Sequence, residues 1–161
     1  MGITPQEAIS ALPGTGALVG RPIRLRGAVL AGPCLLVLLL ARQVAPRADG
    51  FGTHRDLGLP VCSVLAETGW PCPTCGLTTS VSAMAHGRFD RAVAAHPFGP
   101  VVFGAILLLA AAGGAEWVTG RDILGPFKPR LWWALAAVAG VTAGWAVKLV
   151  VGALNGELPL R

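Results

Sequence analysis

The chain has 161 residues and a formal net charge of +5 at pH 7, with a sequence pI of about 9.7. Hydrophobic residues make up 53% and charged residues only 13% of it, and the mean hydropathy is +0.64. This composition excludes an ordinary soluble domain, in which about a quarter of the residues are charged. The basic residues flank apolar blocks and form no stripe with aromatic residues between them, so we expect no nucleic-acid partner.

Apolar residues are concentrated in three separate blocks, a distribution typical of membrane spans. We therefore predict an all-α fold: a polytopic membrane protein with three transmembrane helices. An N-terminal tail is expected over residues 1–26 and a membrane domain over residues 27–161. The predicted spans cover about 27–45, 97–118 and 131–154, and residues 46–96 form a cysteine loop with short interfacial helices.

The first apolar block, Gly27–Ala41, is short for a span and follows three arginines. A span of about 20 residues requires these arginines to extend toward the lipid headgroups. A cleaved signal peptide has a similar basic start and apolar middle. However, no clean small-x-small cleavage site follows and Arg42 interrupts the pattern, which favours an uncleaved span.

Basic residues also predict the orientation. One group lies before the first span and between the second and third spans, on the side that we interpret as cytoplasmic: Arg21, Arg24, Arg26, Arg121, Lys128 and Arg130. A smaller group on the other side opposes it: Arg42, Arg47, Arg88 and Arg91. The cysteine loop is then expected to face outward, into a compartment where disulfides persist.

Within the loop, Leu77–Ala85 has apolar residues at helical spacing and predicts a short amphipathic helix with Thr78, Thr79 and Ser82 away from its apolar face. Phe89–His96 predicts a second brief helix that ends before Pro97.

Two charged residues lie near the ends of the later spans. Glu116 is expected to be in contact with water, because a carboxylate at a helix end is usually hydrated. Lys148 is expected to extend toward the headgroups.

The stretch Trp70–Gly76 reads Trp-Pro-Cys-Pro-Thr-Cys-Gly and forms a Cys-x-x-Cys motif. Pro73 stiffens the turn, and Gly76 permits a positive φ angle. This arrangement directs the sulfurs of Cys72 and Cys75 toward one point, which suits either a metal site or a dithiol/disulfide pair. Helix N-terminal amides after Gly76 are expected to favour the thiolate form of Cys75.

Three uses of these cysteines remain open. A metal site would combine Cys62, Cys72 and Cys75 with a histidine, His86 in the first instance and otherwise His54 or His96, to form a closed Cys₃His site for zinc. A redox site would use Cys72 and Cys75 as the catalytic pair. A static disulfide would join Cys62 to one of them. Cys34 lies inside the first span and is expected to pack as a small apolar side chain.

Sequence features limit these chemistries. A single Cys-x-x-Cys motif without a second pair is a weak zinc signal, and covalent haem attachment requires a histidine where Gly76 stands. No phosphate-binding loop and no nucleophile elbow occurs. The sequence therefore favours a non-enzymatic role.

The motif from Cys72 to Thr78, with Cys62 upstream and His96-Pro97 before a span, resembles a widespread bacterial family of small membrane proteins. That family is a domain of unknown function with a Cys-Pro-x-Cys-Gly-x-Thr-Arg signature. The resemblance covers about residues 59–109. This chain departs from the family pattern at Thr79, where arginine is typical, and at His96, where asparagine is common. The resemblance implies a multi-pass protein of the bacterial plasma (inner) membrane and supplies no reaction.

Together these features predict a small integral membrane protein, an accessory or scaffold component whose Cys-x-x-Cys loop is a structural knuckle held by metal or by a disulfide. The alternative is a membrane thiol-disulfide oxidoreductase that uses Cys72 and Cys75. The expected partners are the lipid bilayer and other membrane protein subunits. The N-terminus is expected in the cytoplasm.

Overall fold

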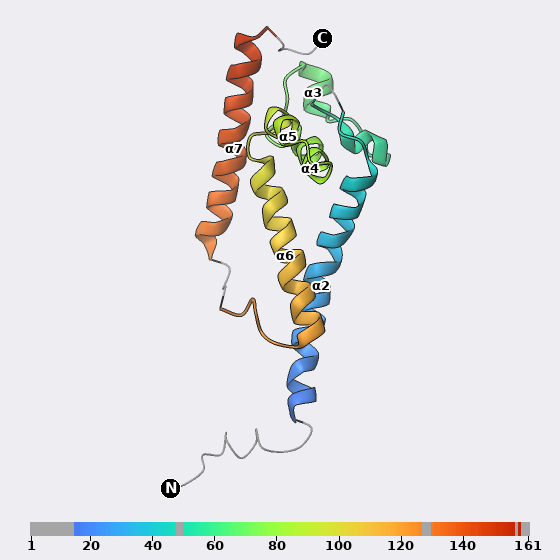
Figure 1. Cartoon of the computed structure of the whole chain (residues 1–161). Coiled ribbons are helices and arrows are strands. Elements are labelled where there is room, and N and C mark those ends of the chain that lie inside the picture. Colours follow the sequence, from blue (N-terminus) through green and yellow to red (C-terminus); the bar gives the residue numbers. More distant parts are fainter. Residues whose placement is uncertain (1–14, 48–49, 127–129, 157, 159–161) are drawn as a thin grey trace. The chain divides into compact units, whose positions relative to one another are not determined.

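The computed structural model describes residues 15–47, 50–126, 130–156 and 158, and all the regular structure in these residues is helical (Figure 1). The all-α prediction is therefore confirmed. The elements in chain order are α2 (Thr15–Gln43), η1 (Thr53–Leu57), α3 (Ser63–Thr68), α4 (Leu77–Ala85), α5 (Phe89–Ala95), α6 (Gly99–Thr119) and α7 (Leu131–Leu154).

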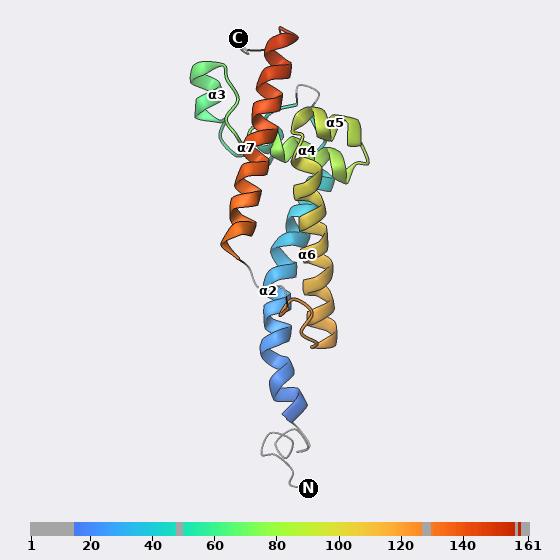
Figure 2. The same ribbon diagram turned by 90° about the vertical axis from the view of Figure 1, so that its left-hand side faces the viewer.

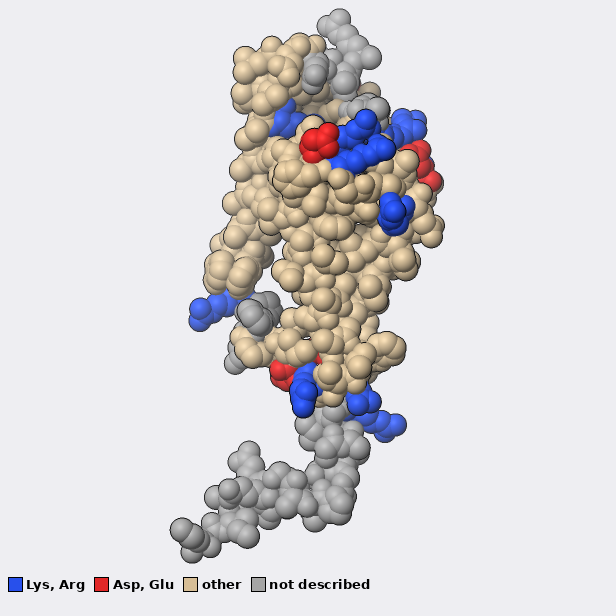
Figure 3. All heavy atoms as spheres, in the orientation of Figure 1, with Lys and Arg blue, Asp and Glu red and all other residues tan. Residues whose placement is uncertain are grey.

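Three of these helices are long and apolar enough to cross a membrane: Arg21–Gln43 within α2, α6, and α7, with mean hydropathies of 1.9, 1.9 and 1.8. At most 17% of any of these segments is buried inside the protein. In water such exposed apolar surface would be costly, whereas in a bilayer it meets lipid. On the face shown in Figure 3, the charged residues lie near the helix ends and loops, and the helix middles carry none.

The predicted spans 97–118 and 131–154 correspond to α6 and α7. Helix α2 begins at Thr15, so part of the expected N-terminal tail is helical. Arginine and leucine are good helix formers, which allows the helix to continue beyond its apolar segment. The remainder of that tail, residues 1–14, lies outside the described residues.

The contacts divide the chain into two units, and α2 and α6 contribute to both. The first unit comprises Met1–Leu35 and Leu107–Lys128, and the second comprises Leu36–Ile106 and Pro129–Arg161.

In the first unit, α2 and α6 approach each other through small residues. A Cβ atom on Gly27 would lie 2.5 Å from the Gly113 carbonyl oxygen, and one on Gly113 would lie 2.9 Å from the Gly27 oxygen. Ala31 and Ala110 are buried. Small residues permit this close backbone approach, which is a common way for membrane helices to associate.

An ion-pair network links Arg26 of α2 to the end of α6 and the loop that follows it. Arg26 donates from Nε to Glu116 Oε2 (3.1 Å) and from Nη2 to Glu116 Oε1 and Asp122 Oδ1 (both 2.5 Å). The backbone amides of Ile123 and Leu124 also donate to Glu116 Oε1, at 3.0 and 2.7 Å. Glu116 is fully buried, so the expected contact with water was wrong: the loop after α6 folds back and replaces it.

In the second unit, α4 and α5 pack against each other, as both views show (Figures 1 and 2). The predicted helix Leu77–Ala85 is confirmed, and Thr78 is exposed, but the other hydroxyl groups of the helix do not face outward. Thr79, Ser80 and Ser82 are buried. Ser80 Oγ donates to the Ala92 carbonyl at 2.7 Å, and Thr79 Oγ1 lies 2.8 Å from Thr53 Oγ1. Hydrogen bonds to partners distant in sequence make the burial of these hydroxyls tolerable.

Helix α7 joins the second unit at the junction of α5 and α6. A Cβ atom on Gly140 would overlap the Phe98 ring, and one on Gly144 would lie 2.9 Å from His96 Cε1. These glycines therefore let α7 contact the segment that precedes α6.

Candidate functional site

Two short segments of the loop present the cysteines. Cys62 precedes the first turn of α3. Cys72 and Cys75 lie in a turn closed by hydrogen bonds from Cys75 N to Cys72 O (2.9 Å) and from Leu77 N to Thr74 O (3.1 Å). Gly76 has φ of +92° and leads the turn directly into α4, a conformation that a residue with a side chain rarely adopts. The predicted turn geometry is thus present.

The prolines of this turn are held by two side chains. Trp145 on α7 donates from Nε1 to the Pro71 carbonyl at 2.7 Å, and His96 Nε2 lies 3.2 Å from the Pro73 carbonyl. Pro71 and His96 are fully buried. These contacts fix the backbone on both sides of Cys72, so the position of its sulfur is set by α7 and by the end of α5.

The ring of His96 is fully used in this role. The Phe98 amide donates to Nδ1 at 3.3 Å, so Nδ1 is an acceptor and Nε2 carries the proton that is donated to Pro73. Burial lowers the pKa of His96, the hydrogen bond to Pro73 partly opposes this, and the charge of Lys148 lowers it further. His96 is therefore a neutral structural residue with no ring nitrogen available to a metal.

The structure brings together three of the predicted site residues. The Sγ atoms of Cys62, Cys72 and Cys75 all lie within 4.8 Å of one another, and those of Cys72 and Cys75 are 3.1 Å apart. All three are free thiols, as is the half-buried Cys34 in α2, which is not part of this cluster.

His86 is not part of the thiol cluster. Its Nδ1 lies 2.8 Å from the Ser82 carbonyl, at the end of α4 opposite the cysteine turn. His54 lines the same cavity of about 600 Å³ as Cys62, Cys72 and Cys75. Its Nε2 lies 3.1 Å from the Pro60 carbonyl.

The two thiols of the motif differ in acidity. Burial acts to raise the pKa of Cys72, but hydrogen bonds from Thr74, Cys75 and Cys62 outweigh it and lower the pKa to about 7. Burial, and then the hydrogen bond with Cys72, raise the pKa of Cys75 to about 12. The expected thiolate at Cys75 was therefore wrong, because burial beside a second thiol outweighs the helix N-terminus. The acidic thiol is Cys72.

Two supporting residues were not predicted from the sequence. In the sequence, Trp145 is one more apolar residue of a predicted span. No local pattern indicates its hydrogen bond to the Pro71 carbonyl, 74 residues away. Thr53 similarly gave no signal of its contact with Thr79. The sequence shows that Thr79 departs from the family pattern, but it does not show that Thr53 is the hydrogen-bond partner of Thr79.

These features define the class of the protein: a helical protein with three helices long and apolar enough to cross a membrane, and a cluster of three cysteines in the loop between the first two of them. Residues 62–110 match the model of a family described as a protein of unknown function (DUF2752). The match contains the whole cysteine cluster, α4, α5 and the first half of α6. No curated protein and no solved structure matches the chain.

Proposed function

We propose that the protein is a non-enzymatic accessory or scaffold component of a membrane, in which Cys62, Cys72 and Cys75 bind one thiophilic metal ion, zinc in the first instance. The observation that carries this proposal is the convergence of the three Sγ atoms within 4.8 Å. Thiolates bind zinc at about 2.3 Å, so three of them around one ion lie at this kind of mutual separation.

The pKa values of Cys72 and Cys75 fit a site in which the bound ion removes the remaining thiol protons. Cys72 is readily deprotonated, whereas Cys75 keeps its proton in the absence of metal. A bound cation deprotonates a coordinating thiol outright, so metal binding would release protons and become tighter as pH rises.

A tetrahedral zinc site needs a fourth ligand. His86, our first candidate from the sequence, lies outside the cluster, and both ring nitrogens of His96 are occupied. His54 lines the cavity of the cysteines, which supports it as the fourth ligand.

The test is the metal content of the purified protein after incubation with zinc and removal of unbound ions. We expect about one zinc per chain in the wild type and in Cys34→Ser, which serves as the matched control. Cys62→Ser and Cys75→Ser should lose metal, and His54→Ala should weaken zinc binding by at least about 10–100-fold, since loss of a residue that only orients a ligand already costs that much. Equal zinc content in Cys34→Ser and Cys75→Ser would contradict the proposal.

A second candidate, thiol-disulfide exchange, is supported by the opposite pKa shifts of Cys72 and Cys75. The Cys72 thiolate would attack a partner disulfide, forming a mixed disulfide and releasing one partner thiolate. Cys75, after loss of its proton, would attack Cys72 Sγ and release the second partner thiolate. The motif would thereby be oxidised by two electrons and the partner disulfide reduced.

This alternative predicts that Cys75→Ser accumulates a mixed disulfide with glutathione when treated with oxidised glutathione, because the second step is blocked. Cys72→Ser should form none at this motif. If Cys75→Ser and the wild type carry equal amounts of mixed disulfide, Cys75 does not act as the resolving thiol.

The proposed location is a bacterial plasma membrane, with the N-terminus in the cytoplasm and the cysteine loop outside. The distribution of basic residues supports this orientation. Labelling of intact cells with a membrane-impermeant maleimide tests it in a cysteine-free background. Asp90→Cys, on α5, should be labelled, and Arg121→Cys, after α6, should be labelled only after lysis. The reverse pattern would overturn the orientation.

A further inference from the structure

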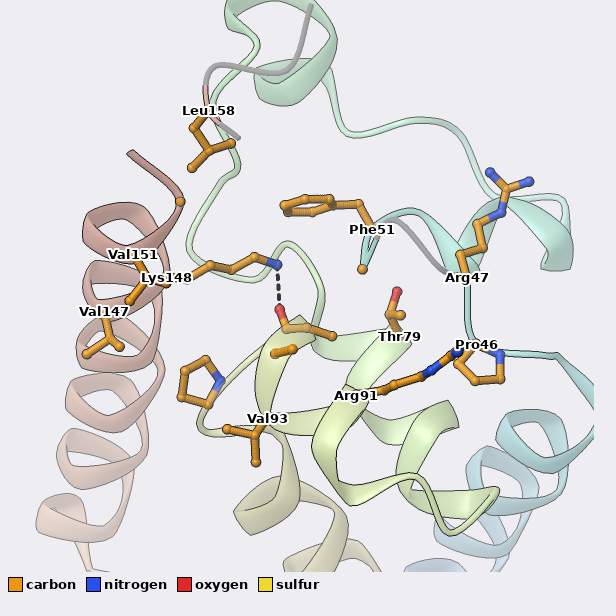
Figure 4. A pocket seen from close by; sticks show the side chains of 15 residues that line it. Pro46, Arg47, Phe51, Thr79, Arg91, Val93, Val147, Lys148, Val151 and Leu158 are labelled. Atoms are coloured by element: carbon orange, nitrogen blue, oxygen red, sulfur yellow. Dashed lines mark hydrogen bonds between the residues drawn. The ribbon is translucent and has the colours of Figure 1, made fainter. Parts of the chain in front are cut away.

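A cavity of about 730 Å³ lies in the second unit, between the last turns of α7, the end of α5 and the segment that follows α2 (Figure 4). It is separate from the cavity of the cysteines, although Phe51 lines both. The proposed metal site does not use it.

Three basic side chains line this cavity, and each comes from a different segment. Lys148 comes from α7, Arg91 from α5 and Arg47 from the segment after α2. None of the described residues that line the cavity is acidic. An anion inside it would therefore meet basic side chains from three segments of the chain.

The basic residues are held to different degrees. Lys148 extends from α7 across the cavity, where its Nζ donates to the Ala95 carbonyl and lies 3.6 Å from the centroid of the Phe51 ring (Figure 4). Arg47 forms an ion pair with Asp56 at 3.1 Å. Arg91 is exposed, and no carboxylate among the described residues pairs with it. Lys148 is thus positioned inside the cavity, and Arg91 is available at its edge.

The rest of the lining is mostly apolar, and part of it belongs to a membrane span. Val147 and Val151 lie on α7, and about half of each side chain is exposed. Val93 and Pro97 line the side formed by α5 and the segment before α6. A ligand with both an anionic group and a hydrocarbon chain fits this combination better than a free ion.

The cavity also lies where spanning helices end. Pro46 follows closely after the end of α2, and Pro97 comes directly before α6. Lys148 lies about two turns before the end of α7. Helix ends of membrane spans are at the level of the lipid headgroups.

We propose that this cavity binds the headgroup of an anionic phospholipid, with the phosphate between Lys148 and Arg91 and an acyl chain along Val147 and Val151. In this proposal Lys148 meets a lipid headgroup, as expected from the sequence, but does so inside the cavity. The lipid would then link α7 to α5, the helix whose end also holds the cysteine turn through His96.

The experiment uses native mass spectrometry of the purified full-length protein, delipidated in detergent and titrated with phosphatidylglycerol or phosphatidylcholine. The bound fraction gives the dissociation constant of each lipid. We expect phosphatidylglycerol to bind more tightly. Arg91→Gln should weaken phosphatidylglycerol binding about fivefold, the contribution typical of one basic residue near anionic lipid, and Arg91→Lys should restore most of it.

Arg88→Gln is the matched control, because Arg88 is an exposed arginine that precedes the same helix and does not line the cavity. It should change the affinity less than twofold. Equal affinities of the wild type for the two lipids, or equal effects of Arg88→Gln and Arg91→Gln, would overturn the proposal.

A further arm adds inorganic phosphate to the protein with phosphatidylglycerol bound. Retention of the lipid supports a site that recognises the whole amphiphile. Displacement of the lipid by phosphate at an equal concentration would show a site for a free anion and would contradict the lipid as its occupant.

Discussion

Cys72 Sγ lies 3.1 Å from Cys75 Sγ, yet the pKa values of the two thiols are shifted in opposite directions, to about 7 and about 12. Cys72 accepts hydrogen bonds at a half-buried position, whereas Cys75 is buried. A thiolate and a thiol are therefore held side by side at neutral pH.

In the reduced, metal-free protein, iodoacetamide should alkylate Cys72 first. Its rate should rise with pH, reach half of its maximum near pH 7 and then level off, because the thiolate is the nucleophile. Cys75 should stay almost unreactive throughout this range. Peptide mass spectrometry after timed alkylation measures both rates.

Thr74→Val provides the control for this assignment. It removes the hydroxyl that lies 3.4 Å from Cys72 Sγ, so the midpoint of Cys72 alkylation should move to higher pH. Equal alkylation rates for Cys72 and Cys75 in the wild type would contradict the description of this pair.

Glu116→Ala should destabilise the first unit. The substitution removes the acceptor of Arg26 and leaves the amides of Ile123 and Leu124 without their partner. We expect the midpoint of thermal unfolding in detergent to fall by about 5 °C or more. Glu67→Ala, at an exposed position of α3, is the control and should leave it nearly unchanged. Equal midpoints for the two variants would show that the network contributes nothing.

Gly99→Ala and Gly104→Ala make a matched pair within α6. A Cβ atom on Gly99 would overlap the buried side chain of Ser80, whereas one on Gly104 would meet nothing within 4 Å. Gly99→Ala should cost about 1–3 kcal/mol, as overpacking usually does. Gly104→Ala should be neutral or stabilising, because alanine favours a helix. Chemical denaturation in mixed micelles compares the two, and a Gly99→Ala protein as stable as Gly104→Ala would contradict this packing.

The lowered pKa of His96 predicts that the protein becomes less stable in acid. Its pKa is lowered from 6.5 in the folded protein, so the unfolded chain takes up a proton before the folded chain does. Stability contributed by neutral His96 is therefore present above about pH 6.5 and falls as the pH decreases below it. The decrease in unfolding temperature between about pH 7.5 and 5.5 should be smaller in His96→Asn than in the wild type. His86→Asn is the control, and equal pH dependence in the two variants would refute this role of His96.

The long apolar helices were predictable from the sequence because they depend on local composition. Long apolar blocks define α6 and α7, and helical spacing of apolar residues defines α4. The Cys-x-x-Cys turn was also predictable, since proline and glycine determine it within a few residues.

Contacts between distant residues were not predictable in this way. Arg26 and Glu116 are 90 positions apart, and neither residue carries a local sign of the other. The hydroxyls of Thr79 and Ser80 seemed suited to an outer surface, because their partners, Thr53 and the Ala92 carbonyl, lie far away in the sequence. For the same reason the sequence could nominate Cys62 for the thiol cluster, but it placed His86 first among three histidines, whereas His54 lines the cavity of the cysteines.

The central claim is that Cys62, Cys72 and Cys75 bind one metal ion together. Its most direct test is the intact mass of the protein, purified without reductant and treated with an alkylating reagent before and after addition of a chelator. We predict that the three clustered cysteines resist alkylation until the chelator is added, with one metal ion bound per chain beforehand. A protein in which two cysteines become alkylated only after reduction, whether or not chelator is present, would contain a disulfide and would contradict the metal site.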